Sequence, residues 1–129
     1  MTRLIITIVL LVGIITAAVF ELMYINRVYN TLETELTAFS QIIYAQENID
    51  TESNITKASD MYDYWIKHEH KLAMIARHID LASISDALIY IKNFVAFNNK
   101  EETCVGIEKL RYLLLTRDFN VGISIQNII

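Results

Sequence analysis

The most regular feature of the sequence is an apolar stripe at alternating steps of three and four residues, the pattern of a helix that packs along one face. The first stripe consists of Leu22, Ile25, Tyr29, Leu32, Leu36, Phe39 and Ile43. An uncharged apolar run, Leu4 to Phe20, precedes it, and neither proline nor glycine separates the two. The pattern predicts one helix from about residue 2 to about residue 45, stopping near residues 47–50.

Three more helices are predicted in the rest of the chain. The second begins near Thr51 or Ser53, where the side chains can cap it, and its stripe is Ala58, Met61, Trp65, His68, Leu72, Ile75 and Ile79. After a break around residues 78–83, Ser83 or Ser85 is expected to cap a third helix with the stripe Ile84, Leu88, Ile91 and Val95. Asn98-Asn99 marks the next turn, and the fourth helix begins near Lys100 and carries Cys104 or Val105, Ile107, Leu110, Leu113 and Leu114.

The C-terminal tail has a different pattern. Arg111 and Arg117 are expected late in the fourth helix, where the helix dipole favours cations. Beyond them Phe119, Val121, Ile123 and Ile125 alternate with polar or small residues. Period two is typical of a strand, but an isolated strand has no partner here. We therefore expect an extended segment packed along the bundle, with a short turn at residues 126–129.

These elements define the expected fold class, which is all-α. A long N-terminal transmembrane helix continues into an extracytoplasmic bundle of about four antiparallel helices. Residues 1–25 form the anchor and residues 26–129 the bundle domain. The composition agrees, because 53% of the residues are hydrophobic, proline is absent and only three glycines occur. A β-sandwich and a glycine-rich phosphate loop both need more turn residues, and a single cysteine allows no intrachain disulfide.

The run Leu4–Phe20 is interpreted as a membrane anchor. As a helix it is about 26 Å long, close to the ~30 Å hydrocarbon core of a bilayer. Apolar residues resume after Glu21, and Tyr24 lies where interfacial aromatic residues are favoured. One alternative is a signal peptide cleaved after Thr16-Ala17-Ala18, which would leave Val19 as the first residue. The other is a buried core helix, although 10–14 apolar residues are more usual for that.

The expected location is the cell membrane of a bacterium, with a single pass. A very short tail containing Arg3 precedes the anchor, and such a tail most simply stays in the cytoplasm. The bundle then lies outside. The net charge of −4 would repel nucleic acid, and no basic stripe or zinc-finger spacing occurs, so nucleic-acid binding is discarded.

The histidines do not form a metal-binding pattern. His68 and His70 are two residues apart and point to different faces of a helix. The metalloprotease motif would need a histidine at position 72, which is Leu72. His70 and His78 are about 12 Å apart along a helix axis, too far to share a metal. We expect His68 at the edge of the core and His70 in solvent.

The remaining candidates for chemistry have structural interpretations that outweigh the functional ones. His78, beside Asp80 at a helix junction, suits the last carbonyls of the second helix better than a general-base role. Cys104 near a helix start could be a reactive thiol, but a lone helical cysteine is more often a small apolar residue. Asp60, Asp63 and Glu69 are expected to form a solvated acidic flank.

The densest aromatic patch surrounds the only tryptophan. Trp65 lies on the apolar stripe and is expected in the core. Tyr62 and Tyr64 point to different sides of the same helix, so at least one of them should reach the surface. An exposed tyrosine at this place is a weak indication of an interaction surface.

Several segments together resemble a known family. They are the anchor at residues 1–20, Trp65 in the second helix, the junction at residues 78–84, the helix at 88–92, the opening at 100–102 and the ending at 124–129. This layout resembles a family of small membrane-anchored helical proteins of Firmicutes known as domain of unknown function 4363. The resemblance implies no activity, but it does imply a multi-pass membrane protein as a partner.

The sequence therefore predicts a non-enzymatic, membrane-anchored helical module. It would hold or tune another membrane protein, or associate with itself, through the first helix and the outer domain. An outward-facing domain that senses a ligand or ion is the alternative. We expect no catalytic residue, no cofactor and no metal.

Overall fold

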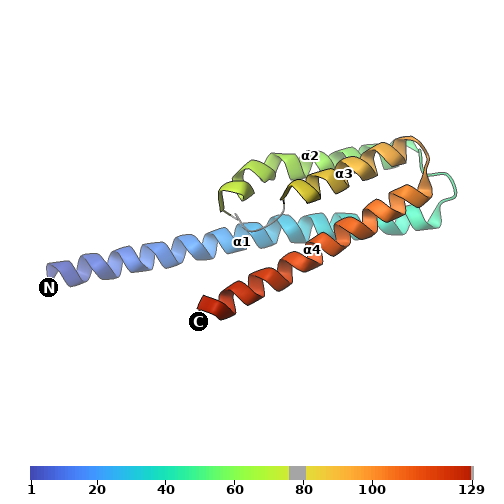
Figure 1. Ribbon diagram of the computed structural model, residues 1–129. Coiled ribbons are helices and arrows are strands. Elements are labelled where there is room, and N and C mark those ends of the chain that lie inside the picture. The colour runs from blue at the N-terminus through green and yellow to red at the C-terminus, as the bar shows by residue number, and fades with distance from the viewer. Residues whose placement is uncertain (76–80, 129) are drawn as a thin grey trace.

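The computed structural model describes residues 1–75 and 81–128, and the chain there is all-α, as predicted. The helices are α1 (Thr2–Ala45), α2 (Glu52–Ile75), α3 (Leu81–Ala96) and α4 (Lys100–Ile128) (Figure 1). No strand occurs in the described residues. The predicted bounds of the first helix are confirmed, and so are the predicted starts of α2 and α4.

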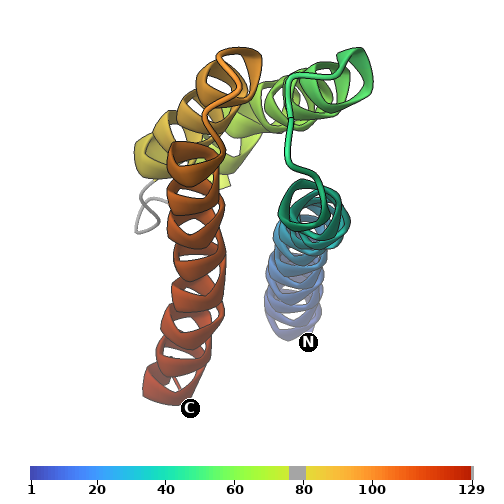
Figure 2. The same ribbon diagram turned by 90° about the vertical axis from the view of Figure 1, so that its right-hand side faces the viewer.

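The four helices form an antiparallel bundle that includes only the second half of α1. Neighbours pack in the order α1–α2, α2–α3, α3–α4 and α4–α1, which closes a ring. In Figure 2, α2 and α3 lie side by side, with α1 and α4 below them. The first half of α1 extends beyond the bundle as a single helix (Figure 1).

The heptad stripe of α1 explains where the bundle begins. Ile25 is the first stripe residue that is buried, and burial continues through Tyr29, Leu32, Leu36, Phe39 and Ile43. Trp65 of α2 is fully buried, and its ring meets that of Tyr29 edge-on, with the centroids 5.9 Å apart. The stripe predicted from the sequence is therefore the wall of an intramolecular core.

The first half of α1 is different, because nothing in the described chain covers it. Its large apolar side chains, from Leu4 to Phe20, are about half exposed or more. Among the described residues α1 is one helix that is long and apolar enough to cross a membrane, with a mean hydropathy of 2.6 over the best window and none of that window buried.

A polar network ties the two loops at the far end of the bundle, residues 46–51 and 97–99. Asn98, at a positive φ of 55°, accepts a hydrogen bond from the Ile49 backbone N–H through Oδ1, at 2.8 Å. The Lys100 ammonium donates to the carbonyls of Tyr44 and Gln46. Gln46 is the residue that follows the end of α1. Lysine at this position satisfies carbonyls that the helix leaves without partners and suits the negative end of its dipole.

The prediction of an extended C-terminal segment is wrong, because α4 continues as a helix to Ile128. Residues 119–125 alternate, but an extended segment without a strand partner leaves its backbone groups unpaired, whereas a helix pairs them internally. No proline interrupts the segment. Arg111 therefore lies in the middle of α4 and not in its last turn.

The predicted cap of the third helix is also wrong. α3 begins at Leu81, so Ser83 lies in its first turn and Ser85 lies inside the helix. The Ser85 hydroxyl instead bonds the carbonyl of Leu81, one turn back, and two side chains of α2.

At Gly106, α4 lies very close to α3. A Cβ added there would lie 2.9 Å from Ile91 Cγ1 and 2.9 Å from Tyr90 Cδ1. The absence of a side chain lets α4 pack against α3 at this point.

Candidate functional site

The end of the bundle where α1 emerges carries an aromatic and basic group, here called the exit cluster: Tyr24, Tyr64, His68 and Lys71. The hydroxyl of Tyr24 and Nδ1 of His68 are hydrogen-bonded at 2.5 Å. The ring of Tyr64 lies 4.7 Å from that of His68, and the Lys71 ammonium lies 4.7 Å from the centre of the Tyr24 ring. The cluster joins α2 to α1 four residues after the apolar run ends.

The surroundings of His68 favour the neutral form of its ring. Partial burial lowers the pKa of His68, and the nearby charges of Lys67 and Lys71 lower it further. The tautomer of the ring decides whether Nδ1 accepts the hydrogen bond from the Tyr24 hydroxyl or donates one to it. The prediction that His68 lies at the edge of the core is confirmed, since His68 is half-buried while His70 is exposed.

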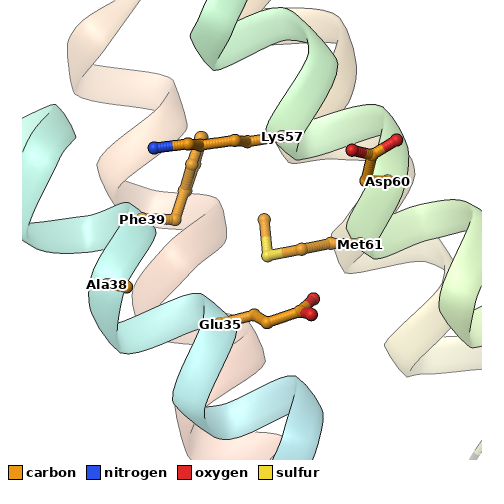
Figure 3. A pocket seen from close by; sticks show the side chains of 6 residues that line it. All are labelled: Glu35, Ala38, Phe39, Lys57, Asp60 and Met61. Atoms are coloured by element: carbon orange, nitrogen blue, oxygen red, sulfur yellow. The ribbon is translucent and has the colours of Figure 1, made fainter.

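A pocket of about 240 Å³ lies between α1 and α2, here called the α1–α2 pocket. Figure 3 shows that Phe39 and Met61 contribute apolar side chains, while Lys57 extends towards one side and the carboxylates of Glu35 and Asp60 lie towards the other. The pocket therefore offers positive charge, negative charge and an apolar surface in one small space.

The charge of Asp60 acts on Glu35 in this pocket. Desolvation raises the pKa of Glu35, and the negative charge of Asp60 raises it further. A cation bound beside Glu35 would favour its charged form and so oppose this rise. The arrangement can thus bind an ammonium group, and Lys57 can bind a carboxylate of the same ligand.

Charge is divided unequally along the bundle. The half farther from the apolar run carries most of the described acidic residues, namely Glu33, Glu35, Glu47, Asp50, Glu52, Asp60, Asp63, Glu101, Glu102 and Glu108. That half also carries basic residues, namely Lys57, Lys92, Lys100, Lys109 and Arg111, and remains net acidic. The half near the exit cluster carries three basic and three acidic residues, namely Arg27, Lys67, Lys71, Glu21, Glu69 and Asp86. The negative charge of the bundle is therefore concentrated at the end far from the apolar run.

Trp65 anchors the helix pair α2–α3. Its indole Nε1 donates to the Ser85 hydroxyl at 2.7 Å, and that hydroxyl donates to the Glu69 carboxylate at 2.9 Å. Glu69 therefore belongs to this interhelical network and not to a solvated acidic flank. The prediction that Trp65 lies in the core is confirmed.

The other candidate residues take structural positions. Tyr62 and Tyr64 are both half-buried, and the Lys92 ammonium lies 5.1 Å from the centre of the Tyr62 ring. Cys104 is half-buried, and desolvation raises its pKa, so its thiol is protonated and not an activated nucleophile. Asp63 is exposed, as predicted.

Some predictions about chemistry fall outside what the structure describes. The pair of His78 and Asp80 lies in residues 76–80, which are not among the described residues. Within the described residues, no group of three or more histidine, cysteine or acidic side chains is arranged to hold a metal ion.

Sequence reasoning missed that Glu35 and Asp60 line the same pocket. They lie on different helices, and each is an ordinary exposed position of its own helix. Only the register of α1 against α2 brings them together, and that register could have been found by pairing Phe39 with Met61 across the two stripes.

No protein-family model matches the chain, and no curated protein or solved structure was found to match it either. The resemblance to domain of unknown function 4363 therefore stays a prediction.

Proposed function

We propose that this protein is a non-enzymatic module that is anchored in a membrane by the first half of α1 and presents its bundle outside the cytoplasm. The observation that supports the proposal is the division of one continuous helix into an uncovered apolar half and a half built into the core. A helix without a break couples the two halves mechanically. A contact made in the bilayer is transmitted to the bundle without an intervening hinge.

The surface left for a protein partner, or for a second copy, is the apolar half of α1. The stripe from Ile25 to Ile43 is buried within the chain, so it is not available to a partner. The apolar half, in contrast, is exposed on every side. Helix association in bilayers depends on close packing along one helix face.

The test is a scan of photoreactive side chains along residues 5–19 of the full chain in native membranes. A multi-pass partner or a second copy is expected to give protein adducts that recur every three to four positions, since only one face of the helix touches it. A matched probe at Phe97, exposed at the far end of the bundle, should give no such adduct. Lipid adducts at all positions, with no protein adduct, would contradict the proposal that a protein partner or a second copy contacts the apolar half of α1.

A ligand-sensing domain is a second candidate function, which the α1–α2 pocket favours. Its opposite charges around an apolar floor suit a small zwitterion, such as a free amino acid, with its ammonium at Glu35 and Asp60 and its carboxylate at Lys57. A ligand that binds only the folded state raises the melting temperature, by an amount equivalent to about 2.7 kcal/mol at a hundredfold excess over Kd.

The pocket is tested by thermal melts of the full chain with each common amino acid. The double variant Glu35→Gln, Asp60→Asn should remove any stabilisation. The control Glu33→Gln, Asp63→Asn makes the same charge change outside this pocket and should retain it. If no amino acid raises the melting temperature of the unaltered chain, the sensor function is wrong for this ligand class.

A further inference from the structure

We propose that the C-terminal end of α2, with Lys67, Lys71 and Met74, lies on the bilayer surface and binds the headgroups of anionic lipids. This inference rests on the proposed membrane anchor. It goes further, because it places a second segment of the chain in contact with lipid and gives that contact a chemical class.

The depth of the exit cluster follows from the length of α1. Tyr24 lies about 6 Å beyond Phe20 along the helix, at 1.5 Å per residue. The headgroup layer on each side of a bilayer is about 5–8 Å thick. Tyr24 therefore lies at the headgroups when the run up to Phe20 occupies the hydrocarbon. Since Tyr24 is bonded to His68 and covered by Lys71, α2 is held at the same level.

The direction of α2 carries its end towards the hydrocarbon. α2 is antiparallel to α1, so the chain beyond Lys71 runs back towards the apolar half of α1 (Figure 1). Met74 lies about 4–5 Å further along that direction. Its side chain is 71% exposed, more than that of Ile66 on the same helix, at 41%. A bilayer boundary at this level would cover Met74.

The charge of this end fits a phosphate surface. Lys67 and Lys71 are exposed on α2, and exposed Arg27 lies less than one turn beyond Tyr24 on α1. Of the nearby carboxylates, Glu69 is bonded to Ser85 towards α3, Asp86 is exposed on α3, and Glu21 lies on α1. The net-acidic end of the bundle points away from the bilayer. The three basic side chains can therefore meet an anionic membrane, where each basic residue near the surface contributes about fivefold in affinity.

The contact is tested on the full chain in vesicles with a fluorophore on a single cysteine. Cys104→Ser provides the background, and Met74→Cys places an environment-sensitive label at the proposed contact. Phe97→Cys is the control at the opposite end, because its side chain is 77% exposed. In vesicles with 30% phosphatidylglycerol the label at position 74 should emit to the blue and be quenched by lipids with headgroup quenchers. The label at position 97 should behave as in water.

The lipid class is tested with charge variants. The triple variant Arg27→Gln, Lys67→Gln, Lys71→Gln should lose the blue shift in anionic vesicles and retain at least fivefold less phosphatidylglycerol after gentle purification. The control Val105→Glu, Lys109→Glu lowers the net charge by the same three units at exposed positions of α4 and should match the unaltered chain. Circular dichroism checks that each variant keeps its helical content.

The outcomes separate this inference from the anchor. A label at position 74 that stays in water, in a chain that resists extraction by alkali, overturns the lipid contact and leaves the anchor intact. An equal blue shift in purely zwitterionic vesicles overturns the anionic class, and a label shielded by a crosslinkable protein overturns the lipid as occupant. Release of the unaltered chain by alkali overturns the proposed function itself.

Discussion

Trp65→Ala is expected to lower the free energy of unfolding of the bundle by about 3–5 kcal/mol, which is the usual cost of truncating a buried large aromatic residue. Trp65 is fully buried, packs edge-on against Tyr29 and bonds Ser85. A domain of this size has a total stability of about 5–15 kcal/mol. The melting temperature of the full chain in detergent, followed by circular dichroism, should fall by about 15 °C.

The adjacent residue provides the control for this prediction. Ile66 is 41% exposed, so Ile66→Ala should change the melting temperature by only a few degrees. The melting temperature of Trp65→Phe should lie between those of Trp65→Ala and Ile66→Ala. This variant keeps most of the ring volume, but it leaves the Ser85 hydroxyl without the indole donor. Equal melting temperatures for Trp65→Ala and Ile66→Ala would show that α2 does not pack in the register described.

The same core decides how substitutions in the α1 stripe must be interpreted. Leu32, Leu36 and Phe39 are buried against the chain's own helices. Polar residues there would unfold the bundle, so loss of a partner in such a variant says nothing about a contact surface. The exposed half of α1 is the place where a partner contact can be altered without loss of the fold.

Most of the fold could be predicted from the sequence because it is local. Stripes at steps of three and four residues give the helices, and the absence of a breaker after Phe20 gives the continuity of α1. The end of α4 could not be predicted in the same way, because alternation and helical periodicity overlap in a short apolar segment. There the internal pairing of backbone groups prevails over the alternating pattern.

The candidate sites depend on contacts between helices, and such contacts cannot be predicted from the sequence of a single helix. His68 was placed correctly at the edge of the core, yet its bond to Tyr24 depends on the register of α1 against α2. The same register brings Glu35 to Asp60. Glu69, expected in solvent, accepts a hydrogen bond from the Ser85 hydroxyl because α3 packs against this face of α2.

Leu11→Arg combined with Ile15→Arg is expected to remove the chain from the membrane. Both side chains are more than half exposed on the apolar half of α1, so neither change touches the core. Each arginine near the centre of a spanning helix costs about 2.5–3.5 kcal/mol, whereas the Leu, Ile, Val and Phe residues of the run together contribute about 5 kcal/mol. The two charges therefore cancel the gain from insertion.

The measurement is extraction of membranes at alkaline pH, with intact mass determined on the protein recovered. The unaltered chain should stay in the pellet at its full mass, and the double arginine variant should appear in the supernatant with its bundle still helical. The control Thr34→Arg, Gln41→Arg adds the same charge on exposed positions of the outer half of α1 and should stay in the pellet. Recovery of the unaltered protein in soluble form with Val19 at its N-terminus would show that the run is a cleaved signal peptide. Since the buried stripe begins only at Ile25, such a cleaved chain would still retain every residue of the α1 core stripe that is buried, so the bundle would fold but would have no anchor to carry it.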